Sequence, residues 1–248
     1  MLELKNVSAG YGKHTVLSGV TATFEKGKMT SIIGANGCGK STLLKAMLGI
    51  VPLISGEIVV DERELLSLSR NEIAKKISYL SQGKTTPDMT VEQMVLHGRF
   101  PYLSYPRRYT QHDKEIAADA MKAVGILELS KKQLHTLSGG MRQNAYIAMA
   151  LAQDTDYIML DEPTTYLDIS HQLGLMKLLR ELADKGKGII TVIHDLPMAF
   201  DFFDEILVID RGSAVAQKKP SELCASSVVK DVFDVNIKCV DGKYYYDA

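Results

Sequence analysis

Residues 34–41 read Gly-Ala-Asn-Gly-Cys-Gly-Lys-Ser and constrain the fold more than any other stretch of the chain. They fit the pattern G-x-x-x-x-G-K-[ST] and stand between a buried-strand pattern at 29–33 and a helical pattern at 40–48. Glycines allow backbone N–H groups to converge on phosphate oxygens, and the start of the following helix adds its positive dipole. The alternative, a glycine-rich turn that only caps a helix, leaves the strand, the spacing, the lysine and the serine unexplained. The segment therefore predicts a phosphate-binding loop.

The rest of the chain indicates an α/β protein. Residues 1–33 alternate as strands do, and short strand patterns follow at 56–61 and 77–80. Later strand patterns alternate with helical ones, which favours a parallel α/β core; the strands are at 157–160, 189–193 and 206–209, and the helices at 169–184 and 196–203.

A helix-rich stretch interrupts this alternation. Helical patterns at 91–97, 113–124 and 140–152 are joined by a segment at 100–109 that is rich in Pro and Tyr. We therefore expect one domain over residues 1–248, with a catalytic core formed by 1–83 and 156–248 and a helical subdomain at 84–155. The tail from Ser213 mixes short strand and helix patterns and carries no motif.

Charge and composition exclude several classes of protein. The net charge of -1 provides no overall basic field for nucleic acid. No apolar run approaches the ~20 residues that span a membrane. The chain opens in strand-like alternation without a signal-segment pattern. Its three cysteines are scattered and form no CxxC pair, so we expect a reduced, cytoplasmic protein.

Two carboxylates, Asp161 and Glu162, end the strand pattern at 157–160. Side chains at the carboxyl ends of parallel strands face the ligand crevice. There Asp161 can hold Mg²⁺ through water, and Glu162 can polarise a water for attack on a phosphate. The pair on its own is also compatible with a solvated strand end, but together with the upstream phosphate loop it indicates phosphate chemistry.

A third motif, Leu-Ser-Gly-Gly at 137–140, opens the helical pattern at 140–152. Two glycines at a helix start leave backbone N–H groups free, which makes a phosphate-binding surface. By itself the segment also reads as an ordinary Ser N-cap.

These motifs, in this order, resemble the ATPase subunit of ATP-binding cassette transporters. The resemblance covers essentially the whole chain and rests on GANGCGKS, Gln82 after a strand, LSGG, LDEPTTYLD and a strand that leads to His194. It implies a P-loop NTPase (RecA-like) core, an N-terminal antiparallel β subdomain and an α-helical insertion. It also implies that ATP and Mg²⁺ bind.

The resemblance assigns roles residue by residue. The resemblance makes Glu162 the catalytic base, with Gln82 and His194 acting beside it. Without the resemblance, Gln82 reads as a polar residue at a strand end, and His194 as a structural hydrogen-bonding residue. Asp168 is an N-cap that also crosses a dimer interface. The implied nucleotide site is formed by Tyr11, Gly34, Asn36, Gly37, Cys38, Gly39, Lys40, Ser41 and Thr42; without the resemblance, Tyr11 reads as a surface turn tyrosine. The implied ligands of the metal are Ser41, Gln82 and Asp161. The residues that would contact the nucleotide of a second copy are Ser138, Gly139, Gly140 and Asp168.

The partners follow from the same resemblance. In a two-fold homodimer each LSGG segment faces the phosphate loop of the other copy, with ATP at the interface. Integral membrane permease subunits and, indirectly, an extracytoplasmic substrate-binding protein complete such systems, which places this chain on the cytoplasmic face of the cell membrane. No nucleic acid partner is expected.

Finer similarities point to one transporter group. The segments Thr90-Val91-Glu92, His97–Pro101 and Leu167–Gln172 are similar to ATPase subunits of iron–siderophore, haem and cobalamin importers. Met141, Asn144 and Met149 depart from the family, because they stand where it usually has polar or basic residues. We favour an iron–siderophore importer; the alternatives are a haem, cobalamin or metal-ion importer, or a soluble ABC ATPase outside transport.

Overall fold

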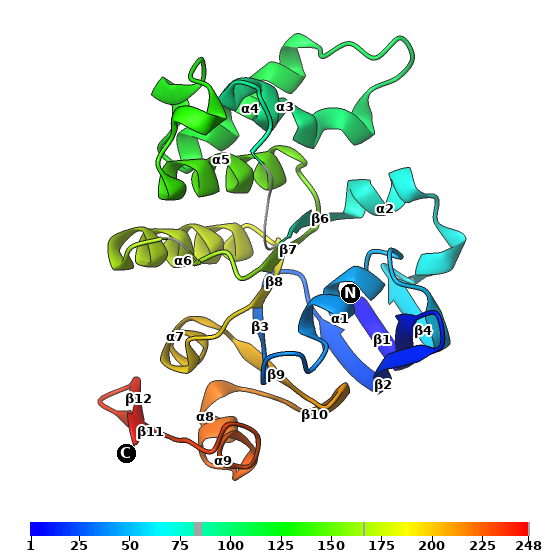
Figure 1. Ribbon diagram of the computed structural model, residues 1–248, viewed down its shortest axis with the longest axis vertical. Helices are drawn as coiled ribbons and strands as arrows, with labels where there is room; N and C mark the ends of the chain where they lie inside the picture. The colour runs from blue at the N-terminus through cyan, green and yellow to red at the C-terminus, as the bar shows by residue number, and fades with distance from the viewer. Residues whose placement is uncertain (82–85, 166, 248) are drawn as a thin grey trace.

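The computed structural model describes residues 1–81, 86–165 and 167–247 (Figure 1). A six-stranded sheet forms its centre, in the order β10–β9–β3–β8–β7–β6. The strands from β9 to β6 run parallel, which confirms the predicted core, and β10 is antiparallel to β9. The strands are β3 (Met29–Ile33), β6 (Ile77–Leu80), β7 (Tyr157–Asp161), β8 (Gly188–Val192), β9 (Glu205–Asp210) and β10 (Ser213–Lys218).

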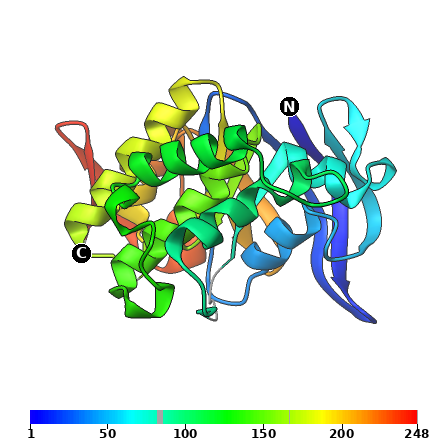
Figure 2. The same cartoon turned by 90° about the horizontal axis from the view of Figure 1, so that it is seen from above.

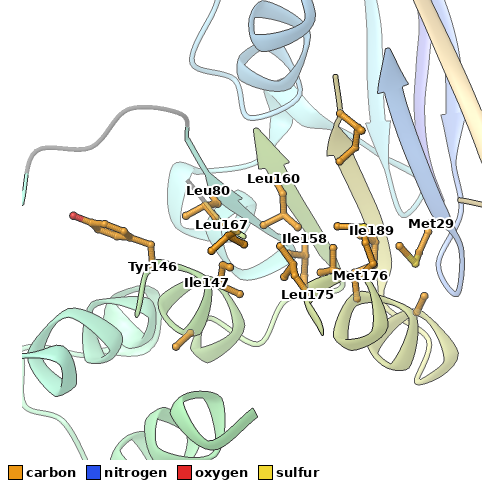
Figure 3. Packing of buried hydrophobic residues seen from close by; sticks show 14 of the residues in the cluster. Met29, Leu80, Tyr146, Ile147, Ile158, Leu160, Leu167, Leu175, Met176 and Ile189 are labelled. Carbon is orange, nitrogen blue, oxygen red and sulfur yellow. The ribbon is translucent and has the colours of Figure 1, made fainter. Parts of the chain in front are cut away.

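The central sheet is buried on both faces, and β7 shows how. Ile158 and Leu160 point into one hydrophobic core, and Tyr157 and Met159 into the other. Figure 3 shows the first core, in which Ile158 and Leu160 pack with residues of neighbouring helices. Continuous apolar strands of this kind are typical of parallel sheets covered on both sides. The helices that follow the strands are α1 (Lys40–Ala46), α6 (Ile169–Asp184) and α7 (Leu196–Phe202).

A second, antiparallel sheet lies at the N-terminal side, as expected, in the order β2–β1–β4–β5. Gly56 in β4 is required there, because a Cβ at this position would lie 2.3 Å from the carbonyl oxygen of Asn6 in β1. The strands are β1 (Leu2–Tyr11), β2 (His14–Phe24), β4 (Leu53–Val60) and β5 (Arg63–Glu64).

The helix-rich part lies to one side of the central sheet, over α6 (Figures 1 and 2). Its helices are α3 (Val91–Leu96), α4 (Gln111–Ala123) and α5 (Gly139–Ala152), with 3₁₀ turns at Leu65–Ser67 before it and at His97–Tyr102, Leu127–Leu129 and Leu134–Thr136 within it. Capping boxes at Thr90 and Thr110 start α3 and α4. The limits 84 and 155 of this subdomain stay a prediction.

One buried ion pair holds the helical part together. Arg99 Nε donates to Asp113 Oδ1 at 3.0 Å, and Arg99 Nη1 donates to the carbonyl of Ala152 at 2.9 Å. Both charged side chains are buried, with relative exposures of 6% and 7%. The pair therefore links the 3₁₀ turn after α3 to the start of α4 and to the end of α5.

Helix α2 (Arg70–Lys76) was not predicted from the sequence. Its signal is a capping box in which Ser69 and Glu72 bond reciprocally to each other's backbone N–H groups. The C-terminal tail forms α8 (Pro220–Cys224), α9 (Val228–Phe233) and a hairpin of β11 (Asn236–Val240) and β12 (Lys243–Asp247). Within the described ranges, no helix combines the length and the apolar character that crossing a membrane requires.

Candidate functional site

The strand order brings three predicted motifs to one edge of the central sheet. Strands β3, β8 and β7 are neighbours and parallel, with Ile32 opposite Val192 and Val192 opposite Asp161. The phosphate loop follows β3, His194 follows β8, and Glu162 follows β7. Segments that are far apart in the sequence thus meet at the carboxyl ends of adjacent strands, where ligands bind in open α/β sheets.

The phosphate loop is closely packed. A Cβ at Gly34 would lie 2.2 Å from the carbonyl oxygen of Ile209, and Gly39 has a φ of +109° and faces Leu17. Gly39 precedes α1 without any side-chain cap, so it leaves the first N–H groups of this helix to a ligand. Lys40 is buried within the loop, where its Nζ donates to the carbonyls of Gly34 at 2.7 Å and Ala35 at 2.9 Å.

A cavity of about 540 Å³ lies over this loop. It brings together eight residues of the predicted site and one further residue, Val16 of β2: its lining is Val16, Asn36, Gly37, Gly39, Lys40, Ser41, Thr42, Glu162 and His194. Val16 was missed because, in the sequence, it reads only as one more position of a strand. Tyr11 ends β1, half exposed, and does not line this cavity.

Cys38 lies beneath the loop rather than in the cavity. Its side chain is 7% exposed and packs in the hydrophobic core on the N-terminal side of the sheet. Burial raises the pKa of the Cys38 thiol, although the nearby Lys40 charge opposes the shift. A contact between Cys38 and a nucleotide is therefore limited to its backbone.

Glu162 and His194 form a pair at the mouth of the cavity. His194 Nε2 lies 2.5 Å from Glu162 Oε1. Glu162 has a φ of +51°, in the left-handed region that non-glycine residues rarely adopt. Such conformations cluster at functional sites, where the surrounding structure holds the side chain in one direction. The glutamate is thus fixed between the end of β7 and the imidazole.

Asp161 fits a bound divalent cation. Its carboxylate is 3% exposed; Oδ2 accepts from Tyr79 Oη at 3.3 Å, and buried Oδ1 has no hydrogen-bond partner among the described residues. Burial raises the pKa of Asp161, and the neighbouring Ser41 and Tyr79 hydroxyls oppose this shift only in part. A buried carboxylate with an unsatisfied oxygen next to a serine hydroxyl is the donor set that Mg²⁺ uses beside a phosphate loop. Gln82, also predicted to contact the metal, lies outside the described residues.

The segment at 138–140 does not line the cavity of its own chain. Ser138 is the N-cap of α5, where its Oγ accepts from Met141 N at 3.3 Å. Ser138 and Gly139 are exposed at the start of the helix, and Met141 beside them is 46% exposed. The Ser N-cap and an exposed glycine at the helix start are thus present together.

Helix α5 nevertheless contacts the segment that follows Glu162. Gln143 Nε2 donates to the carbonyl of Pro163 at 3.0 Å, and a Cβ at Gly140 would lie 3.6 Å from Leu167. Leu167 is buried in the same core as Ile147 of α5 (Figure 3). Next to it, Asp168 caps α6 by accepting from His171 N at 2.9 Å.

Comparison with known proteins identifies the family. Residues 17–165 match the family described as ABC transporter. The chain is 40% identical over 234 residues to the petrobactin import ATP-binding protein FpuD of Bacillus anthracis, covering 94% of this chain and 86% of that protein. It is 39% identical over 239 residues to the ferric enterobactin transport ATP-binding protein FepC of Escherichia coli K12, covering 96% and 88%.

A solved structure shares the fold. The dimeric structure of a post-hydrolysis state of the ATP-binding cassette MJ0796, bound to ADP and Pi, superposes with a TM-score of 0.76 at 27% identity, covering 89% of this chain and 99% of that one. With the family match and the relatives above, this shows that the chain belongs to the ABC transporter family, as one of its ATP-binding subunits.

Proposed function

We propose that this chain hydrolyses ATP in a head-to-tail homodimer to drive uptake of an iron–siderophore or related metal chelate. The observation that carries the hydrolysis is the cavity in which the phosphate loop, Glu162 and His194 meet. The substrate class rests on relatives whose names give petrobactin import and ferric enterobactin transport. A haem, cobalamin or metal-ion cargo is the alternative within the same function.

In this proposal the loop residues hold the triphosphate of ATP. Amides of residues 36–39 and the start of α1 bind phosphate oxygens, and Lys40 exchanges the loop carbonyls for the β- and γ-phosphates. Val16 lines the cavity from β2, and Tyr11, half exposed at the end of β1, offers a ring on which adenine can stack.

Ser41, Asp161 and Gln82 hold Mg²⁺, which, when bound, screens the charge of the phosphates. Thr42 adds a hydroxyl to the same helix turn. Glu162 takes a proton from the attacking water, and His194 holds the glutamate in position and contacts the γ-phosphate. The left-handed backbone at Glu162 supports this assignment, because it fixes the direction of the carboxylate before ATP arrives.

The dimer completes the site. Ser138 and Gly139 are exposed at a helix start, Gly140 is half-buried beside them, and none of the three lines the cavity of its own chain, which leaves the segment available to the γ-phosphate held by a second copy. Asp168 contacts the nucleotide of the partner from the loop beside them.

A membrane permease docks, in this proposal, on an apolar groove next to the Pro- and Tyr-rich segment. The groove has a volume of about 510 Å³ and is lined mainly by the turn after α1, the 3₁₀ turn at 65–67 and α2. Ile50 and Leu66 beside it are 63% and 65% exposed. Tyr102 adjoins the groove, because its Oη donates to the carbonyl of Gln153, which lines it. A peripheral position on the cytoplasmic face of the membrane follows.

Co-purification tests the transport role. The tagged chain is expected to carry a polytopic permease out of detergent-solubilised membranes, and Ile50→Asp with Leu66→Asp to lose it while binding ATP normally. Val215→Asp, the same kind of change at an exposed apolar position of β10 that does not line the groove, serves as the control and keeps the permease. Co-purification with ribosomes instead, unaffected by the groove variants, would favour a soluble ABC ATPase.

Ser138→Arg tests the role of the segment at 138–140 across the dimer. The isolated chain is expected to bind ATP with its normal affinity, because Ser138 lies outside its own cavity, but to lose ATP hydrolysis by at least ~10²-fold. Fluorescent-nucleotide titration and phosphate release measure the two properties. Ser130→Arg, a change of the same size away from this segment, is the control. Wild-type hydrolysis in Ser138→Arg would exclude the trans role.

A further inference from the structure

Two cysteines that are separate in the sequence lie together at the C-terminal end of the molecule. Cys224 is the last residue of α8, and its Sγ donates to the carbonyl of Ile237 in β11 at 3.2 Å. Cys239 stands two residues farther along the same strand. In a strand, the carbonyl of one residue and the N–H of the second residue after it point to the same edge. The Cys224 sulfur therefore sits on the edge where Cys239 presents its N–H.

Cys224 also lies near Cys239 itself. Burial is the main cause of the raised pKa of the Cys224 thiol, and the proximity of Cys239 adds to it. Together with the contact to Ile237, two residues before Cys239, this places the Cys224 sulfur near the Cys239 side chain. Opposite Cys239 in the hairpin stands Tyr244, whose pKa is raised by burial and by its proximity to both thiols.

The two thiols differ in access. Cys239 is exposed, whereas Cys224 is half-buried, and burial raises the pKa of its thiol. Both are free in the structure. An exposed thiol beside a half-buried one is the arrangement of an attacking and a resolving cysteine.

We propose that Cys224 and Cys239 form a dithiol site that small-molecule disulfides oxidise to an intramolecular disulfide. In the first step the Cys239 thiolate attacks one sulfur of the small disulfide, and the other sulfur leaves as a thiol after taking up the proton from Cys239. In the second step the Cys224 thiolate attacks the Cys239 sulfur and releases the second small thiol, which takes up the proton from Cys224. Two protein thiols are oxidised and one small disulfide is reduced to two thiols.

The position of the site gives this oxidation a structural consequence. The hairpin packs on α7: the rings of Phe200 and Tyr244 lie 5.2 Å apart, and Tyr244 N donates to Asp201 Oδ1 at 3.1 Å. Helix α7 begins directly after Asp195, the neighbour of His194. The disulfide would tie α8 to the hairpin that supports this helix, at a distance from the nucleotide cavity.

The test uses the full chain and oxidised glutathione as the probe. After oxidation, remaining thiols are blocked by alkylation and the intact mass is measured. We expect loss of two hydrogens without a glutathione adduct on either residue, and reversal by dithiothreitol. Because Lys230 and Lys238 separate the two cysteines, trypsin places them on different peptides, and the disulfide is detected as a cross-linked pair.

Cys224→Ser is the decisive control, since it keeps the exposed thiol and removes the resolving one. It should accumulate the glutathione adduct at Cys239 to a level at least about tenfold above that of the wild type. Cys239→Ser, which lacks the exposed thiol, should form no cross-link, and any glutathione adduct at Cys224 should form more slowly than the adduct at Cys239 in Cys224→Ser. An equal adduct level in the wild type and Cys224→Ser would overturn the proposal, as would a cross-link that joins two copies or involves Cys38.

Discussion

Replacing Glu162 by glutamine is expected to lower ATP turnover by ~10²- to 10⁴-fold, the usual contribution of a general base. Glutamine keeps the shape of the side chain and cannot accept a proton from water. ATP binding should survive, because the phosphate loop and Lys40 are untouched. With hydrolysis blocked, ATP stays at the interface, and the variant should elute as an ATP-dependent dimer in gel filtration.

Two controls make this result specific. Glu57→Gln, the same change on an exposed strand position, should leave turnover and elution unchanged. His194→Ala should lower turnover and weaken ATP binding less than a change in the phosphate loop would, because the proposal gives the imidazole one contact to Glu162 and one to the γ-phosphate. A Glu162→Gln variant that remains monomeric with ATP and Mg²⁺ would contradict the proposed dimer.

Replacing Arg99 by methionine is expected to lower the free energy of unfolding by about 3–5 kcal/mol, because it leaves the buried carboxylate of Asp113 without its counter-charge. The same change frees the carbonyl of Ala152 at the end of α5. Urea unfolding followed by circular dichroism measures the loss. Arg63→Met is the matched control, since it breaks an exposed pair with Glu72 and should change the free energy of unfolding far less.

The pH dependence of stability gives an independent check. Burial opposes ionisation of Asp113, but hydrogen bonds from Thr110 and the Arg99 charge together hold its pKa below the usual value of 3.8. A carboxyl group with a lowered folded-state pKa contributes its stability above the ordinary pKa and loses it as the pH falls through the folded value. The Arg99→Met penalty should therefore be full at neutral pH and shrink as the pH falls, because Asp113, still buried but without the Arg99 charge, takes up a proton at a higher pH in the variant than in the wild type. A penalty that is constant down to pH 3 would contradict this account.

The central fold could be predicted because local patterns and chain topology agree. A glycine loop between a strand and a helix, followed by alternating strands and helices, permits few arrangements other than a parallel sheet. The sheet order then brings Glu162 and His194 together, since both follow neighbouring strands. The register of β7 against β8 sets their contact, and the sequence motifs do not specify that register directly.

The features that were missed depend on local or long-range contacts that the patterns do not carry. Helix α2 begins at a Ser-x-x-Glu capping box that was present in the sequence but not used. Val16 lines the cavity only because β2 passes over the loop. Cys224 contacts the strand that holds Cys239 because the chain turns back after α8. The positions of the two cysteines in the sequence do not predict this contact.

The contact between helix α5 and the segment after Glu162 has a thermodynamic consequence. Gln143 and Leu167 join the helical part to the segment after Glu162, the proposed catalytic base, so the two parts are in direct contact. If a protein bound to the helical part changes the affinity for ATP by some factor, ATP must change the affinity for that protein by the same factor. One hydrogen bond and one buried leucine would thus couple the binding of nucleotide to the binding of that protein.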